Sequence, residues 1–252
     1  MQTPQDRNEV DVVQFRHLLR NFEQVEDTAR TRLIGSEKKE FAHFFDCFSR
    51  ADRSEMMKLH QYAPSFNLFT ILGIAYAEDR VHTPFLSNLL DPSASHGQEF
   101  LFMDNFLFFL FGDSKTGRVA NVNVYREYST FDGVIDILVK MEVDQKPWII
   151  VIENKIYAPD QPKQLERYYK VVRKLFADDT NCLIVYLTPD GRKPSPISIS
   201  TELLNELMAA GNFRCLSYRE DISGWLEKSL TEILAPTVKE TVRQYLGIAK
   251  NL

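Results

Sequence analysis

Apolar residues at helical spacing dominate the first part of the sequence. From Val10 to about Leu33 they recur every three or four positions with charged residues between them, which predicts an amphipathic helix. Four phenylalanines between positions 41 and 48 form a second stripe of this kind, bounded by Gly35 and by the polar stretch 49–54. Apolar stripes on helices are usually buried, so we expect both to pack against other helices.

Further helices are expected before the pattern changes. Ser65 can cap the free backbone N–H groups of a helix that runs to about Glu78, and Pro84 opens the next one. No long linker rich in Gly, Ser or Pro marks a domain boundary. We therefore divide the chain into a helical N-terminal extension, residues 1–60, and one α/β domain, residues 61–252.

From about Asn121 the pattern becomes that of β-strands. Val122 and Val124 lead to Asp132-Gly133, a dipeptide typical of tight hairpin turns, and a second strand is expected from Val134. Residues 148–152 are an uninterrupted apolar run, which predicts a central strand covered on both faces. The remaining segments expected are a helix at 161–176, a strand at 182–187, and helices at 203–208, 222–234 and 238–246.

Composition narrows the class of protein. A chain of 252 residues that is 44% hydrophobic can bury a substantial core. The three cysteines are scattered without CxxC spacing, which argues against a disulfide framework and a structural zinc site and favours the cytoplasm. The most apolar run, residues 100–111, is about half the ~20 residues that a membrane span needs. We expect a buried or partner-facing helix there and no contact with a membrane.

Three charged residues stand where strands should be apolar. Asp136 interrupts the apolar face that Val134 and Leu138 share, while Glu153 and Lys155 close the central strand at a spacing that puts both on one face. Burying an unpaired charge costs several kcal/mol, roughly, unless it pairs with another charge or a bound ion. The sequence therefore predicts that two carboxylates and one ammonium group converge.

Hydrolysis of a phosphodiester bond needs this set of groups. Mg²⁺ takes oxygen ligands, commonly one or two carboxylates with waters and phosphate oxygens, and Mn²⁺ is an alternative ion for the same ligands. Asp136 and Glu153 would supply the carboxylates, with the backbone carbonyl of Asn154 as a further candidate ligand. Lys155 would help activate the attacking water and offset negative charge in the transition state.

At these residues the sequence resembles the PD-(D/E)XK nuclease superfamily. An aspartate on the second strand of a hairpin, followed by a hydrophobic strand that ends in (D/E)-x-K, is its signature, and here Ile135 replaces the usual proline. Pro159-Asp160 and Pro189-Asp190 follow the Glu-x-Lys element and do not fit the pattern. The resemblance implies a restriction-endonuclease-like α/β core with the order αβββαβ, in which a right-handed helical crossover leads to the fourth strand of a mixed sheet flanked by helices.

The resemblance extends to other residues, closest to an uncharacterised bacterial family of the superfamily. Gln164 and Tyr168 resemble the Q-x-x-x-Y element that exonuclease-like members carry on the helix after the catalytic strand. Glu78 matches an acidic residue that joins the metal site, with Glu127 as its rival. The resemblance also covers His82 and His96, which would position phosphate or, alternatively, serve as helix-capping or core histidines.

The net charge of the chain limits how it could bind nucleic acid. The formal net charge of −5 is unusual for a protein that binds nucleic acid, so contact with phosphate must come from a local patch. The segment from Lys155 to Lys174 is such a patch, although a solvated helix face is the alternative. Its basic residues are Lys155, Lys163, Arg167, Lys170, Arg173 and Lys174, against Asp160 and Glu166.

We expect a metal-dependent nuclease that acts on DNA, with Glu78, Asp136, Glu153, Lys155, Gln164 and Tyr168 in the catalytic centre. His82, Lys163, Arg167 and Lys170 are expected to contact the substrate. The main alternative is a catalytically inactive module that binds nucleic acid or regulates a partner on the same fold. A third hypothesis is that the phenylalanine-rich helices form an interface, through which the chain forms a homodimer or binds another protein.

Overall fold

The computed structural model describes residues 4–63, 65–112, 117–176 and 180–252, with residues 4–14 and 62 described by their backbone alone. The chain divides into two compact units, one up to Phe66 and one from Asn67 to Leu252. Each unit is described separately below.

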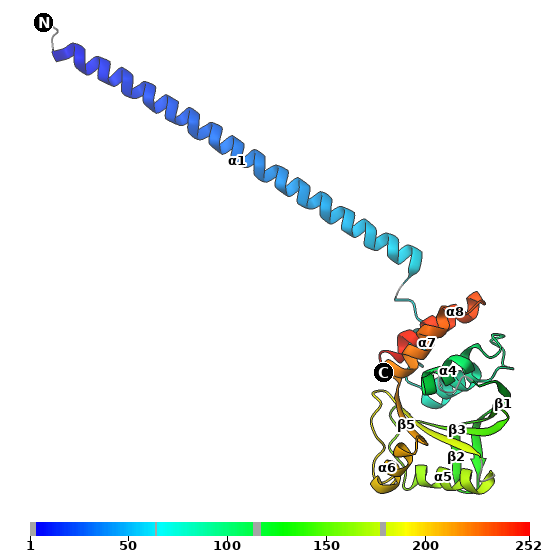
Figure 1. Ribbon diagram of the computed structural model, residues 1–252. Coiled ribbons are helices and arrows are strands. Elements are labelled where there is room, and N and C mark those ends of the chain that lie inside the picture. Colours follow the sequence, from blue (N-terminus) through cyan, green and yellow to red (C-terminus); the bar gives the residue numbers. More distant parts are fainter. Residues whose placement is uncertain (1–3, 64, 113–116, 177–179) are drawn as a thin grey trace. The chain divides into compact units, whose positions relative to one another are not determined.

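The first unit is one long helix, α1, from Pro4 to Tyr62 (Figure 1). The sequence predicted two helices separated near Gly35, and this prediction is wrong because the helix continues through that residue. A single glycine costs only about 1 kcal/mol in a helix, and the residues that follow Gly35 include good helix formers such as Lys38 and Lys39. The large apolar side chains that the structure describes on α1 are exposed, among them Phe22 at 70% and Phe44 at 63%.

The second unit begins with short helical segments rather than the helix expected from Ser65 to Glu78. Asn67 caps α2 (Leu68–Ile71) by accepting hydrogen bonds from the N–H groups of Phe69 and Thr70. The chain then turns at Gly73, whose φ of +66° suits glycine. A π-helical turn, η1 (Glu78–His82), leads directly into α3 (Thr83–Leu90), which Pro84 opens as predicted.

A mixed five-stranded sheet forms the centre of the second unit, with the strand order β1-β2-β3-β4-β5. The strands β1 (Val119–Thr130), β2 (Gly133–Val143) and β3 (Lys146–Asn154) are antiparallel neighbours. The helix α5 (Gln164–Leu175) then leads to β4 (Asn181–Thr188), which runs parallel to β3. This arrangement confirms the predicted mixed sheet.

The fifth strand was not predicted. β5 (Phe213–Ser217) runs parallel to β4 and follows α6 (Thr201–Ala209). It has only five residues and includes the exposed Arg214, so its sequence carries too few apolar positions to distinguish a strand from a loop.

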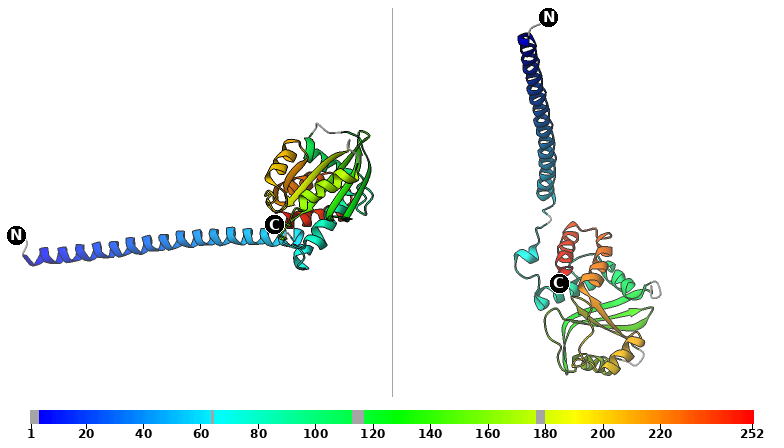
Figure 2. Two further views of the ribbon diagram at one scale, coloured as in Figure 1. Left: turned by 90° about the horizontal axis from the view of Figure 1, so that it is seen from below. Right: turned by 90° about the vertical axis from the view of Figure 1, so that its left-hand side faces the viewer.

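Helices cover both faces of the sheet (Figures 1 and 2). On one face, α3, α4 (Leu101–Phe111), α7 (Ser223–Leu230) and α8 (Pro236–Ala249) form a large core with Ile137, Ile150 and Val185. On the other face, α5 and α6 pack on Ile149, Val151 and Tyr186. The run at 100–111 is thus largely a buried helix, as expected. Among the described residues, no helix combines the length and apolar character needed to cross a membrane.

Candidate active site

The sheet register brings the two acidic residues together. Ile137 of β2 pairs with Ile152 of β3 in an antiparallel register, so Asp136 and Glu153 occupy the next positions on the two strands. Lys155 follows the last residue of β3, and its backbone N–H donates to the carbonyl of Leu187 on β4 at 2.8 Å. The site therefore lies where β3 ends between two neighbouring strands.

Direct contacts join these groups to Glu78. The Nζ atom of Lys155 lies 2.7 Å from Oε1 of Glu153, and both side chains are buried. The N–H of Asn154 donates to Oδ2 of Asp136 at 2.7 Å, and the N–H of Ile156 donates to Oε2 of Glu78 at 2.6 Å. Two carboxylates thus hold the backbone at the end of β3, one from β2 and one from η1.

Glu153 is the least satisfied group of the site. Its side chain is 1% exposed, and the ammonium group of Lys155, 2.7 Å from Oε1, is the cation that it contacts. This ion pair offsets only part of the cost of burial, because the charge of Asp136 lies beside the same carboxylate. Because a buried carboxylate next to a second one is costly, this position favours either a proton or a further cation on Glu153.

Burial changes the pKa values of both acidic residues. It raises the pKa of Glu153 to about 8, and the negative charge of Asp136 adds to this effect while Lys155 opposes it. Burial also raises the pKa of Asp136 to about 6, against the hydrogen bond from Asn154 and the charge of Lys155. For Lys155, burial acts to lower the pKa, but the carboxylates of Glu153, Asp136 and Glu78 together outweigh it and the pKa is raised. Lys155 therefore remains a cation beside two acids.

Asn154 links this site to the helical layer behind the sheet. Its side chain is fully buried, donates to Oγ1 of Thr83 at 3.0 Å and accepts from the hydroxyl of Tyr218 at 2.9 Å. Thr83 and Tyr218 could not be singled out from the sequence, because neither interrupts an apolar pattern. These contacts orient Asn154 and so hold the backbone of Glu153 and Lys155 on either side of it.

His82 does not lie where a substrate could reach it, and we correct the expectation that it binds substrate. Its side chain is fully buried, with Nδ1 2.9 Å from the hydroxyl of Tyr245 and Nε2 2.9 Å from the carbonyl of Ala75. Burial lowers its pKa to about 4, so the ring is neutral at pH 7. His82 is a core histidine.

His96 is also a structural residue. Its Nδ1 accepts from the N–H of Gln98 and its Nε2 lies 2.9 Å from the carbonyl of Asp91, so the ring bridges two parts of one loop. Its side chain is 6% exposed. Both ring nitrogens are thus engaged within the protein, which leaves none to position a phosphate.

Gln164 and Tyr168 lie at the site from the first turns of α5. Nε2 of Gln164 donates to the hydroxyl of Tyr168 at 3.0 Å, and that hydroxyl donates to the carbonyl of Val134 on β2. Burial and then the charge of Glu153 raise the pKa of Tyr168, which keeps it a neutral donor near this carboxylate. Oε1 of Gln164 is buried and has no partner among the described residues.

The predicted basic residues sit on or next to the same helix. Lys163, which precedes α5 with a φ of +53°, and Lys170 are exposed. Arg167 is half-buried, and its guanidinium donates to the carbonyl of Pro162. Glu127, the rival of Glu78, is exposed on β1, and no contact joins it to Asp136 or Glu153 among the described residues.

The donor set fits a hard divalent cation with few protein ligands. Within the described part of the chain, no three His, Cys, Asp or Glu side chains are grouped to hold a metal ion by themselves. Two neighbouring carboxylates are nevertheless present, and that of Glu153 is buried with Lys155 as its contacting cation. Mg²⁺ commonly uses one or two carboxylates and completes its shell with water and phosphate oxygens.

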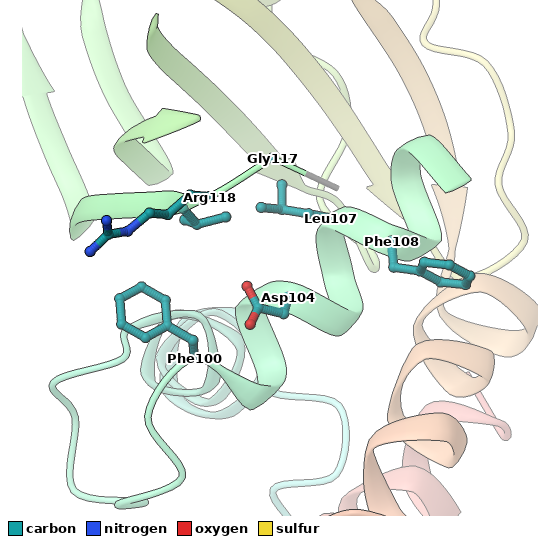
Figure 3. A pocket seen from close by; sticks show the side chains of 7 residues that line it. Phe100, Asp104, Leu107, Phe108, Gly117 and Arg118 are labelled. Carbon is teal, nitrogen blue, oxygen red and sulfur yellow. The ribbon is translucent and has the colours of Figure 1, made fainter. Parts of the chain in front are cut away.

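A separate pocket of about 430 Å³ lies at the other end of the sheet (Figure 3). Phe100, Asp104 and Phe108, at and near α4, line it together with Arg118. Val119 pairs with Val143, which is seven residues along β2 from Asp136, or roughly 23 Å at ~3.3 Å per residue. This pocket contains none of the candidate catalytic residues.

Fold and site together define an α/β protein of the restriction-endonuclease-like type. The PD-(D/E)XK nuclease superfamily matches residues 66–247, which is well over half of the chain. The chain therefore belongs to the PD-(D/E)XK nuclease superfamily, as the strand signature predicted. No curated protein and no solved structure matches the chain.

The raised pKa of Glu153 predicts how stability depends on pH without metal. The folded protein holds a proton on Glu153 up to about pH 8, whereas the unfolded chain releases it near the ordinary value of 4.5. The free energy of unfolding should therefore fall as pH rises toward 8; below about pH 6 Asp136 adds to the fall, and below about pH 6.5 His82, whose pKa is lowered, opposes it. Glu153→Gln should remove the fall between about pH 6.5 and 8.

Urea unfolding in EDTA across this pH range measures the effect. The exposed Glu206→Gln on α6 is a matched control and should keep the wild-type dependence. An unchanged slope in Glu153→Gln would contradict the buried state of this carboxyl group.

Proposed function

We propose that this protein is a Mg²⁺-dependent nuclease that hydrolyses phosphodiester bonds in DNA. The observation that carries the proposal is Glu153, a buried carboxylate that lies beside a second acid, Asp136, with Lys155 as its contacting cation, in a member of a nuclease superfamily. A folded chain that keeps two buried acids next to each other pays in stability, and a bound cation offsets that cost.

Asp136 and Glu153 would hold the metal ion, with the backbone carbonyl of Asn154 as a further candidate ligand. When bound, Mg²⁺ stabilises charge on the scissile phosphate and acidifies a bound water, and Mn²⁺ can substitute for it. The protein's own part is to keep both carboxylates fixed. The hydrogen bond from Asn154 to Asp136 and the side-chain contacts of Asn154 serve this purpose.

Lys155 would act on the water and on the developing charge. Its raised pKa keeps the ammonium group charged, so it can donate a hydrogen bond to the attacking water and offset negative charge in the transition state. Glu78 holds the backbone just after Lys155 through the N–H of Ile156 and thereby positions it. Gln164 and Tyr168, two neutral groups, would complete the site on the side of α5.

The substrate's phosphates would meet the basic side of α5. Lys163 and Lys170 are exposed there, and Arg167 lies between them in the sequence. A local excess of positive charge can bind phosphate even though the whole chain is acidic.

Substitution of Lys155 tests the proposed reaction. Lys155→Ala should lower the rate of Mg²⁺-dependent DNA cleavage by about a hundredfold or more, because one donor to the transition state is lost. Asp136→Asn should reduce it at least as much through weaker metal binding. The matched control is Lys146→Ala, an exposed lysine at the opposite end of the same strand, which should cleave at the wild-type rate.

Cleavage by Lys155→Ala at the wild-type rate would refute the assignment. Binding of single-stranded DNA, duplex DNA or RNA that is insensitive to EDTA, without cleavage by the wild type in Mg²⁺ or Mn²⁺, would instead support the inactive binding module.

For α1 we propose association with a second copy of the chain. The helix exposes a long apolar row that includes Leu18, Phe22, Phe41, Phe44 and Phe48. Water-exposed apolar side chains at this density are unfavourable, and helices with such rows commonly pair along them. A second copy brings an identical row, and the flanking charges of both signs remain in solvent, including the ion pair between Asp46 and Arg50.

Light scattering of the full chain checks this. The wild type should have about twice the mass of one 29.3 kDa chain, and the double variant Phe44→Glu/Phe48→Glu should be monomeric. The control Lys39→Glu/Arg53→Glu places two acidic residues on the opposite side of the helix, by 3.6 residues per turn, and should remain dimeric. A monomeric wild type would contradict the proposal.

A further inference from the structure

Two exposed tyrosines stand next to the proposed active site. Tyr76 is 56% exposed and Tyr157 is 68% exposed, and their ring centroids are 5.9 Å apart at an interplanar angle of 61°. Tyr76 precedes Glu78 by two residues, and Tyr157 follows Lys155 by two residues. The pair is thus formed by the two segments that bring Glu78 and Lys155 into the site.

A hydrogen bond fixes the pair relative to the carboxylates. The N–H of Ile156, the residue before Tyr157, donates to Oε2 of Glu78 at 2.6 Å. This bond ties the loop after β3 to the start of η1, so the two segments that carry the tyrosines are held beside Glu78. Their position beside the site is therefore set by the same contact that positions Lys155.

The faces of these rings are available, unlike those of several other exposed rings of the same unit. Lys140 lies over Tyr125 at 4.9 Å, Lys174 over Phe131 at 4.7 Å and Lys228 over Phe108 at 3.4 Å. Among the described residues no cation covers Tyr76 or Tyr157, and their contact with each other is edge to face. An edge-to-face pair leaves ring area open to a third aromatic group.

We propose that Tyr76 and Tyr157 form a stacking platform for an unpaired base next to the cleaved phosphodiester. This inference rests on the proposed function and names its substrate class as nucleic acid with single-stranded character at the cleavage point. Every base has a π-face that can stack on tyrosine, whereas in a duplex those faces are already covered by neighbouring bases. The platform would hold one nucleotide beside the carboxylates and thereby place its phosphate at the site.

Tyr157→Ala tests the platform through binding rather than cleavage. The probe is a short single-stranded oligodeoxynucleotide that carries one 2-aminopurine, whose fluorescence is quenched on stacking, and the medium contains EDTA. The variant should bind this probe about tenfold more weakly, a typical loss for one base–aromatic stack, and should lose the quenching. Tyr157→Trp should retain both, and the affinity for the blunt duplex should change little.

The matched control is Phe100→Ala, which removes another partly exposed ring, in the pocket at the far end of the sheet (Figure 3). Phe100→Ala should bind the probe and quench its fluorescence as the wild type does. Because Tyr157 is exposed, Tyr157→Ala leaves no cavity and should fold normally, which circular dichroism and thermal unfolding would verify. Unchanged affinity and quenching in Tyr157→Ala, or an equal loss in Phe100→Ala, would overturn the platform. If the wild type binds and quenches but does not cleave in Mg²⁺, the nuclease proposal fails while the platform stands.

Discussion

The burial of Glu153 beside Asp136 at the end of β3 is the constraint on which the rest of the site depends. Two acidic groups in neighbouring register positions repel each other, and burial raises the pKa of both. Lys155, at 2.7 Å from Glu153, offsets part of this cost, but it is one cation beside two acidic groups. The fold thus maintains a local deficit of positive charge that a divalent cation would fill.

The surrounding structure holds this unfavourable group in place. The central strand β3 is covered on both faces, and Asn154, between Glu153 and Lys155, is hydrogen-bonded to Thr83 and Tyr218. A hydrogen bond to Glu78 secures the next turn of the chain. The stable core therefore holds an unfavourable group of charges in place at the end of β3, as rigid elements commonly do for functional sites.

The sheet and the three charged residues Asp136, Glu153 and Lys155 could be predicted from the sequence, because charged residues inside apolar strands are conspicuous. Asp136 and Glu153 interrupt periodic patterns, and antiparallel pairing then brings them together. Contacts between distant segments could not be predicted in this way. His82, for example, is held in the core by a hydrogen bond with Tyr245, more than a hundred and fifty residues away. The short strand β5 was also missed, because its pairing with β4 outweighs the weak strand preference of its own residues. The continuation of α1 through Gly35 was missed because one glycine costs too little to end a long helix.

Calorimetric titration of Mn²⁺ into the full chain tests most directly whether the two carboxylates share a cation. At pH 7 the wild type should bind the ion and release protons, because Glu153, with its pKa of about 8, must lose its proton to become a ligand. The number of protons released follows from repeating the titration in buffers of different ionisation heat, and Glu153→Gln should abolish the release. Binding of Mn²⁺ with the same affinity and proton release in Glu153→Gln would contradict the account.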